Sequence, residues 1–273
     1  MRKLVFLIVF FTSLFFTSCE EVVDVDLDTA PPKLVIEAAI TWEKGTTGKQ
    51  QVIRLTSTTG YFENVIPAVS NAVVYVTNSK NQKFNFIEFN NTGRYICPNF
   101  RPEINEEYTL TVIDKGNTYT ASEVLKSVAP INRIEQKNNS GFTGEDIEIK
   151  AYFTDPAEED NFYLFKYVYS NKVTSNYYVS EDKFYQGNEI FSSAIDEDLK
   201  AGDEVEVTHY GISKQYYNYM NILVSIAGSN VGGPFQSPPA TVKGNIINTT
   251  DKNNYPLGYF SLSETSTQKY KIE

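Results

Sequence analysis

Short runs in which apolar and polar residues alternate constrain this fold more than any other feature of the sequence. In the clearest run, which covers residues 107–113, the side chains of Tyr108, Leu110 and Val112 fall on one side and threonines fall on the other. A period of two is that of a β-strand with one buried face. Comparable runs recur at regular spacing with turn residues between them, which is the pattern of a β-sandwich.

We therefore predict a mainly β protein with two domains. Residues 33–127 are predicted to form an immunoglobulin-like (Ig-like) or transthyretin-like β-sandwich. Residues 128–273 are predicted to form a second β-rich domain with one amphipathic helix at about 213–228. The helix is predicted because apolar residues recur there at intervals of three and four, with Ser213 as N-cap and Gly228 as stop signal.

Shorter segments of the second domain are assigned from their local pattern. Residues 138–141 are predicted to be a polar loop, and residues 183–185 are predicted to continue the strand pattern. Residues 257–262 and 267–272 are predicted to be two closing strands.

Residues 1–18 have the composition of a bacterial lipoprotein signal peptide. A basic start precedes an apolar core of 13 residues, from Leu4 to Phe16. As a helix this core would span about 20 Å, short of the roughly 30 Å of a bilayer's hydrocarbon core. Two small residues then precede Cys19, in a sequence that resembles a lipobox, where the cysteine is acylated after cleavage. A permanent transmembrane helix and an ordinary cysteine beside a cleavage site are the alternatives.

Residues 19–32 form an acidic tether. Its acids resemble the export signal that Bacteroidota place after the lipidated cysteine of surface-exposed lipoproteins, and they are Glu20, Glu21, Asp24, Asp26 and Asp28. A solvated tether without a sorting role would have the same composition and stays an alternative. The triplet that ends at Ala30 resembles the short O-glycosylation motif of that phylum, which makes Thr29 a candidate glycosylation site.

The charge of the chain excludes one class of partner. Without residues 1–18 the chain has 22 basic residues (24 less Arg2 and Lys3) against 34 acidic residues, a net charge of −12. Binding to nucleic acid requires a basic surface, so we expect no nucleic-acid partner.

Two residues are expected to have structural roles. If Cys19 is acylated, Cys97 has no intrachain partner, so we expect no disulfide framework and predict a buried thiol at Cys97. The stretch from Arg101 to Val112 resembles the tyrosine corner of Ig-like domains, so Tyr108 is predicted to form structural hydrogen bonds.

No catalytic motif is legible in the sequence. The single histidine, His209, lies in an alternating run without a nucleophile motif, and we interpret it as structural. We expect no metal site and no cofactor; the candidate ligands for Ca²⁺ would be Asp155, Glu158 and Asp160, whose spacing matches no EF-hand loop. A hydrolase built on His209 or on paired carboxylates is an alternative that the sequence does not support.

Adjacent aromatic residues allow a carbohydrate-binding interpretation. Candidate stacking platforms are Tyr61-Phe62, Tyr177-Tyr178 and Tyr216-Tyr217. Packing of these rings against a sheet is the alternative.

Several segments together resemble an uncharacterised family of Bacteroidota lipoproteins, the domain of unknown function DUF4249. The matching segments include Cys19–Val22, Leu34–Glu37, Tyr108–Val112, Gly233–Phe235 and Leu257–Ser261. The resemblance covers essentially the whole chain after the signal peptide. It implies a surface or outer-membrane lipoprotein, often encoded near a TonB-dependent transporter, and it supplies no catalytic residues.

We therefore expect a surface-exposed, lipid-anchored protein of the outer membrane without enzymatic activity. Its expected partners are the membrane, through the N-terminal lipid, and a TonB-dependent transporter or related β-barrel that it assists in ligand capture or complex assembly. A stand-alone module that binds a glycan or a peptide is the alternative.

The anchor can be tested by substitution. Cys19→Ala is expected to release or mislocalise the protein, because it removes the residue that carries the acyl chains. Even a single acyl chain holds a protein at a bilayer only marginally. Neutralising Glu20, Glu21 and Asp24 is expected to leave it lipidated but facing the periplasm. Protease shaving of whole cells measures this, and unchanged surface exposure of the neutralised variant would contradict the export signal.

Overall fold

A computed structural model describes residues 31–60, 63–157, 159–228 and 242–273. The predicted signal peptide, Cys19, the acids of the tether and Thr29 lie outside these residues. In the part of the chain that is described, no helix is long and apolar enough to cross a bilayer.

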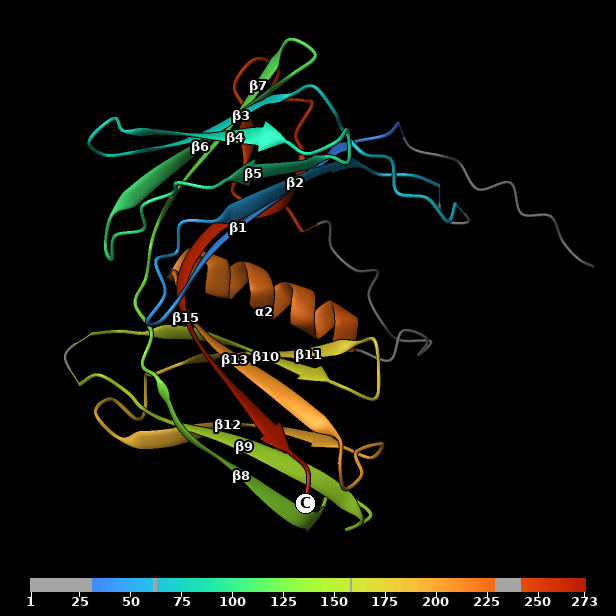
Figure 1. Cartoon of the computed structure of the whole chain (residues 1–273), viewed down its shortest axis with the longest axis vertical. Helices are drawn as coiled ribbons and strands as arrows, with labels where there is room; N and C mark the ends of the chain where they lie inside the picture. The colour runs from blue at the N-terminus through green and yellow to red at the C-terminus, as the bar shows by residue number, and fades with distance from the viewer. Residues whose placement is uncertain (1–30, 61–62, 158, 229–241) are drawn as a thin grey trace, which may run out of the picture. The chain divides into compact units, whose positions relative to one another are not determined.

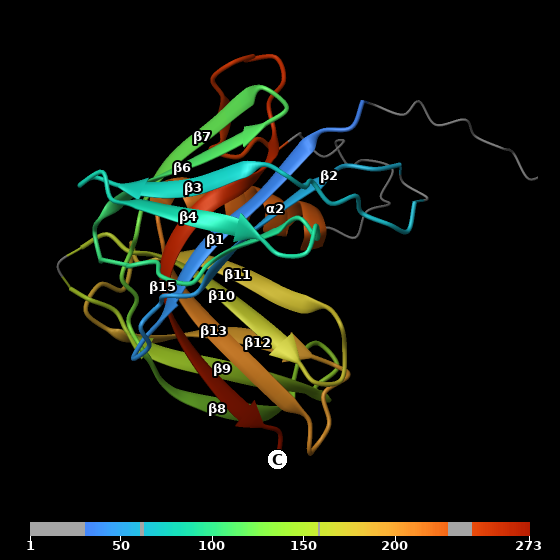
Figure 2. The ribbon, with the colours of Figure 1, turned by 45° about the horizontal axis from the view of Figure 1, so that its top comes forward.

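The described residues form fifteen strands and one helix (Figures 1 and 2). In chain order these are β1 (Leu34–Glu43), β2 (Gln51–Ser57), β3 (Val73–Asn78), β4 (Lys83–Glu88), β5 (Arg94–Cys97), β6 (Glu107–Asp114), β7 (Asn117–Val124), β8 (Ile131–Ser140), β9 (Asp146–Thr154), β10 (Phe162–Tyr169), β11 (Ser175–Glu181), β12 (Glu189–Asp196), β13 (Glu204–Ile212), α2 (Lys214–Gly228), β14 (Ile247–Asn248) and β15 (Leu257–Lys271). The prediction of a mainly β protein is confirmed, and the described residues contain the predicted helix.

The strands form two sheets. The larger has twelve strands in the order β11-β10-β13-β15-β1-β2-β5-β4-β3-β6-β7-β14, and the smaller has three in the order β12-β9-β8. The larger sheet folds over on itself around one core and faces the smaller sheet across another (Figure 1). Both cores therefore lie between packed β-layers, as in a sandwich.

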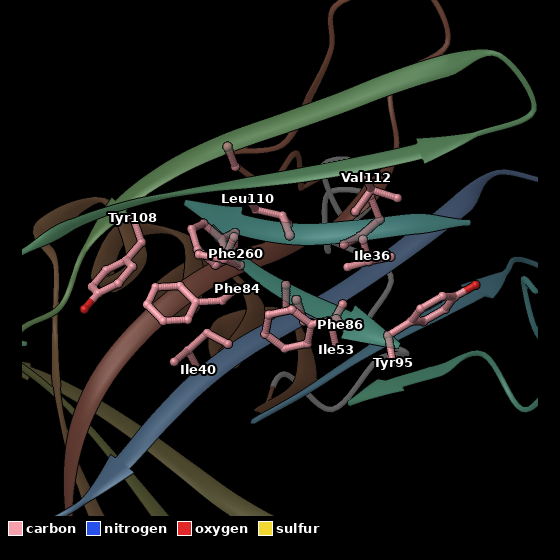
Figure 3. Packing of buried hydrophobic residues seen from close by; sticks show 14 of the residues in the cluster. Ile36, Ile40, Ile53, Phe84, Phe86, Tyr95, Tyr108, Leu110, Val112 and Phe260 are labelled. Carbon is pink, nitrogen blue, oxygen red and sulfur yellow. The ribbon is translucent and has the colours of Figure 1, made fainter. Parts of the chain in front are cut away.

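The first core is formed by β1 to β7 and by part of β15. Its centre is aromatic and aliphatic, with Phe84, Phe86 and Phe260 between Tyr108 at one end and Tyr95 at the other (Figure 3). All five side chains are buried. Burial of apolar area on this scale is the main favourable term in folding.

Tyr108 forms the predicted tyrosine corner. Its hydroxyl donates a hydrogen bond to the carbonyl of Arg101 at 2.7 Å and accepts one from the amide of Glu103 at 3.0 Å. Burial raises the pKa of this hydroxyl to about 12, so it stays protonated and can donate. The corner fixes the loop that leads into β6.

The second core lies between β10, β13 and the end of β15 on one side and β8, β9 and β12 on the other. Strand β10 supplies alternate inward aromatic side chains, which are Tyr163, Phe165, Tyr167 and Tyr169. The inward aromatic residues of this strand thus recur with the period of two that is typical of a β-strand.

Strand β15 belongs to both cores. Its first part pairs in parallel with β1, from Leu257 opposite Val35 to Thr265 opposite Glu43. Its second part pairs antiparallel with β13, up to Lys271 opposite Glu204. The two predicted closing strands are thus one strand of 15 residues.

This shared strand bears on the predicted boundary at residues 127 and 128. Ile246, Phe260 and Leu262 lie in the first core although the prediction assigns them to the second domain. The division into 33–127 and 128–273 stays a prediction about separate domains, because the described residues mix the two ranges in one core.

Helix α2 begins and ends close to its predicted limits. The amide of Tyr216 donates to the Ser213 hydroxyl at 3.1 Å, so Ser213 is the N-cap. The rings of Tyr216 and Tyr219 lie 4.7 and 4.6 Å from the ring of Tyr259 in β15, and Tyr217 contacts Phe162 in β10. The aromatic stripe of the helix therefore packs against the sheet.

Two local predictions were wrong. Residues 138–140 end β8 instead of forming a loop, and Asn139 has the left-handed backbone (φ 59°) within an irregularity of the β8–β9 pairing. Residues 183–185 form a turn, in which the amide of Tyr185 donates to the carbonyl of Asp182. Polar and turn-forming residues determine the backbone conformation in both segments. The alternation of apolar residues therefore did not indicate the structure there.

The close approach of β15 to β1 predicts an asymmetry between two glycines with nearly the same φ angle. A Cβ at Gly258 (φ 98°) would lie 2.1 Å from the carbonyl oxygen of Ile36, whereas a Cβ at Gly202 (φ 97°) meets nothing within 4 Å. Gly202→Ala is expected to cost about 1 kcal/mol in free energy of unfolding from backbone strain alone. Gly258→Ala should cost at least about 2 kcal/mol more. Urea unfolding of both variants measures this, and equal midpoints would contradict the pairing.

Candidate functional site

A groove opens between the free edges of the two sheets that enclose the second core. Strand β11 ends the order of the larger sheet and β12 ends that of the smaller, so neither has a partner on its outer side among the described strands. Residues of both strands, together with Phe165 and Tyr185, line a groove of about 470 Å³. A volume of this size suits a small ligand or a few residues of a peptide.

The floor and walls of this groove are mostly apolar. The buried Phe165 of β10 lines the groove, together with Tyr178 of β11 and Ile190 of β12. The Tyr178 ring packs edge-on against Tyr167, with centroids 5.6 Å apart. Because Tyr167 is fully buried, this wall is held by the core.

The groove also offers neutral hydroxyl groups. Ser180, Ser192 and Ser193 line it, and burial raises the pKa of Tyr185, so that its hydroxyl is uncharged near neutral pH. The lining therefore combines aromatic faces with hydroxyl groups and with the Glu189 carboxylate, which is paired with Arg133. This combination fits a polar or amphipathic ligand.

One edge of the groove continues onto the outer face of the small sheet. Phe191 lines the groove and is 46% exposed, and its ring lies 5.1 Å from that of Tyr152. Arg133 lies 3.8 Å over the Tyr152 ring, and Lys150 lies 4.5 Å from the Phe191 ring centre. Exposed aromatic residues beside arginine are enriched at the energetic centres of protein interfaces.

The charges of this edge are paired. Arg133 forms salt bridges with Glu135 and with Glu189, the first residue of β12. These contacts lower the pKa of both carboxyl groups and raise that of the guanidinium. Exposed pairs of this kind add little stability, so their effect is to fix the position of the charges.

A second hollow lies where β1, β13 and β15 meet. It has a volume of about 400 Å³ and is lined by threonines and by Glu43. The Glu43 carboxylate accepts hydrogen bonds from the hydroxyls of Thr265 (2.7 Å) and Thr267 (2.8 Å) and from the amide of Thr267 (2.9 Å). Because the carboxylate oxygens are used in hydrogen bonds that hold β1 to β15, we interpret this hollow as structural.

His209 is a core residue and cannot reach a substrate. It is fully buried, and its ring stacks on Phe165 at 4.2 Å and contacts Phe153 at 4.4 Å. Burial lowers its pKa to about 3, and Nδ1 hydrogen-bonds the carbonyl of Ala129 at 3.0 Å. The ring is therefore neutral, and it donates from Nδ1 because the carbonyl can only accept.

Cys97 is the buried thiol that the sequence predicts. It is free and fully buried, and burial raises its pKa. A protonated, enclosed thiol is a poor nucleophile.

The residues of the predicted aromatic platforms lie in different parts of the structure. Tyr178 lines the groove, whereas Tyr177 pairs with Lys166 on the opposite face of the sheet. Tyr216 and Tyr217 serve the packing of α2. Tyr61-Phe62 lies outside the described residues.

The candidate Ca²⁺ ligands do not form a site in the residues that the structure covers. Asp155 is buried and accepts a hydrogen bond from the Tyr163 hydroxyl at 2.5 Å, while Asp160 accepts one from Gln186. Glu158 lies outside the described residues, and no group of three metal-binding side chains occurs within them. Burial raises the pKa of Asp155, which disfavours the charged form that a cation would need.

The groove was missed from sequence because β12 was missed. Residues 189–196 alternate, with Ile190 and Ala194 turned inward and Phe191 and Ile195 left half exposed. Apolar residues on both faces blur the period of two, and pairing with β9 is a long-range event. The feature of the sequence that could have indicated the groove was Phe191, an aromatic residue followed by two serines.

Comparison with known proteins identifies the family. The fold is a β-rich pair of packed cores with a groove and no legible catalytic group among the described residues. The family model described as a domain of unknown function, DUF4249, matches residues 20–269, so the chain belongs to this family. None of the curated proteins compared with the chain matches it.

Three solved structures have segments similar to this chain. A two-domain fibronectin type-III segment from chicken tenascin is 14% identical, covering 66% of this chain and 90% of that one with a TM-score of 0.21. A cytokine receptor complex is 9% identical, covering 68% and 86%, with a TM-score of 0.25. Chicken CNTN1 FN1-FN3 is 13% identical, covering 66% and 63%, with a TM-score of 0.24. Scores this low carry no functional conclusion.

The buried histidine predicts a pH dependence of stability. His209 has a folded pKa of about 3, below its ordinary value of 6.5, so below pH 6.5 the unfolded state binds a proton that the folded state refuses. Stability is therefore lost as pH falls from 6.5 towards 3, by about 1.4 kcal/mol per pH unit from this residue. His209→Phe should flatten the curve by this amount between pH 6 and 4, as measured by urea unfolding. Parallel curves for the two proteins would contradict the assignment.

Proposed function

We propose that this chain is a lipid-anchored, surface-exposed protein of the bacterial outer membrane that has no enzymatic activity. It acts as an accessory partner of a TonB-dependent transporter or related β-barrel, and it assists ligand capture or assembly of the complex. The groove between β11 and β12 is the surface through which it engages its partner or the ligand.

One observation carries this proposal. The groove is lined by aromatic side chains, and its edge is exposed to water. Phe191 exposes nearly half of its surface to water beside Tyr152 and Arg133. Exposed apolar groups of this kind, next to polar and charged ones, mark interaction sites. Two free strand edges beside the groove can also accept a strand of a partner, because their outer backbone groups are unpaired.

The chemistry of the described residues favours binding over reaction. His209 and Cys97 are enclosed in the two cores, and the Asp155 carboxyl is engaged by Tyr163. The signal sequence with Cys19, the acids after it and the family resemblance support the location at the cell surface.

A stand-alone glycan- or peptide-binding module is the second candidate. The same groove favours it, because Tyr178, Tyr185 and Phe191 offer ring faces beside three serine hydroxyls. Sugars and extended peptides both combine apolar faces with hydrogen-bonding groups. In this case the groove would bind its ligand without a barrel.

The groove can be tested by a charge placed on its edge. Phe191→Asp is expected to reduce recovery of a β-barrel protein with this chain from detergent-solubilised outer membranes by about tenfold or more. The reason is that loss of an aromatic contact in an interface costs about 1–4 kcal/mol of binding. Quantitative mass spectrometry of the co-purified proteins measures the effect.

Phe142→Asp is the matched control, because Phe142 is fully exposed in the turn after β8 and does not line the groove. It introduces the same charge and should leave recovery unchanged. Failure of the wild-type chain to recover any barrel would refute the accessory role. Glycan-array binding that Phe191→Asp abolishes and Phe142→Asp retains would then establish the second candidate.

A further inference from the structure

A second surface of the molecule concentrates positive charge in an acidic chain. A hollow of about 450 Å³ is lined by Lys243, Lys252, Tyr255 and Ile247. Lys33 joins it, because its Nζ lies 3.4 Å from the centre of the Tyr255 ring, and the Nζ of Lys243 lies 4.4 Å from that centre. These five residues are called the Tyr255 patch below.

The ammonium groups of this patch lack partners of opposite charge. None of Lys33, Lys243 and Lys252 forms a salt bridge with a carboxylate among the described residues. Two of them, Lys33 and Lys243, contact the same Tyr255 ring in a chain whose formal net charge is −10. A hydrogen bond and the charge of Lys33, reinforced by Lys243, lower the pKa of the Tyr255 hydroxyl. The local potential therefore favours an anion.

The loop that carries the patch is rigidly built. The Asn248 side chain is buried, donates to Asn117 and to the carbonyl of Asn254, and accepts from the amides of Thr250 and Asp251. Strand β14 pairs with β7 at this point. The lysines thus extend from a fixed base, which lowers the entropy lost when they bind.

The position of Lys33 in the chain connects the patch with the membrane anchor. Lys33 lies 14 residues after Cys19, and a fully extended chain of that length reaches about 50 Å. Its amide donates to the Thr58 hydroxyl at 2.9 Å, so this residue is fixed to the folded body. A lipid on Cys19 keeps Lys33 within reach of the bilayer surface.

We propose that the Tyr255 patch binds the anionic headgroups of the membrane in which the chain is anchored, and so orients the folded body on that surface. Lysines attract anionic headgroups, and a tyrosine with an exposed isoleucine suits the boundary between headgroups and acyl chains. Ile247 is 61% exposed and supplies the apolar contact. The inference rests on the proposed function, because it takes the lipid anchor as given.

Lysine acylation measured by mass spectrometry tests this contact in the full, lipidated chain. The chain is reconstituted in vesicles of phosphatidylcholine alone and in vesicles with roughly a third of phosphatidylglycerol, and a water-soluble amine reagent is added. Lys33, Lys243 and Lys252 should react about fivefold more slowly in the anionic vesicles, and about 0.5 M NaCl should remove the difference. Lys200, which is exposed in the loop before β13, should react equally in both.

The double variant Lys243→Glu/Lys252→Glu should remove the protection of Lys33, whereas Lys200→Glu should preserve it. Equal rates for the patch lysines in both vesicles would overturn the inference. Protection by inorganic phosphate without vesicles, and none by anionic vesicles, would overturn it in favour of a soluble phosphate ligand.

Failure of the anchor gives a different result. If the natural chain proves not to be lipidated, it will not sediment with phosphatidylcholine vesicles, and that result counts against the proposed function. If the chain without lipid still sediments with anionic vesicles, and the double variant does not, the result supports the patch. If the chain without lipid does not sediment with anionic vesicles, the patch is overturned as well.

Discussion

The parallel pairing of β15 with β1 is the interaction on which the described structure depends. It joins residues 257–265 to residues 35–43, the two ends of the folded body in sequence, and it carries Phe260 and Leu262 into the first core. The same strand then pairs with β13 and so enters the second sandwich. At the changeover, Glu43 accepts hydrogen bonds from Thr265 and Thr267, which closes the junction with satisfied polar groups. One strand therefore makes the stability of each core depend on the other.

This construction explains where binding surfaces can occur. The inner strands are paired on both sides, while β11, β14, β12 and β8 end the two sheets. Residues of β11 and β12 form the walls of the groove. Phe165, which lines the groove, also stacks on the buried His209, so the groove rests on the second core. A rigid body with a preformed apolar groove suits recognition, because little entropy is lost on binding. The Tyr255 patch lies on a loop bound to β7, and it is built from different residues.

The sequence predicted those parts of the fold that local pattern determines. In β10 the inward aromatic residues recur at every second position, and α2 shows its N-cap and stripe directly. Strand β8 was missed because its exposed edge carries polar residues, and β12 because it is apolar on both faces. The pairing of β15 with β1 links positions more than 200 residues apart, so no local rule reveals it. The groove could not be predicted for the same reason, since its two walls belong to different sheets.

The central claim is that the two cores form one cooperative unit through β15. Native-state hydrogen exchange at increasing denaturant tests it most directly, with amides of β6 reporting on the first core and amides of β9 on the second. The account predicts that the most protected amides of both strands exchange through one opening, with the same free energy and the same dependence on denaturant. If the β9 amides exchanged through an opening that left β6 protected, the cores would be independent and the claim would be wrong.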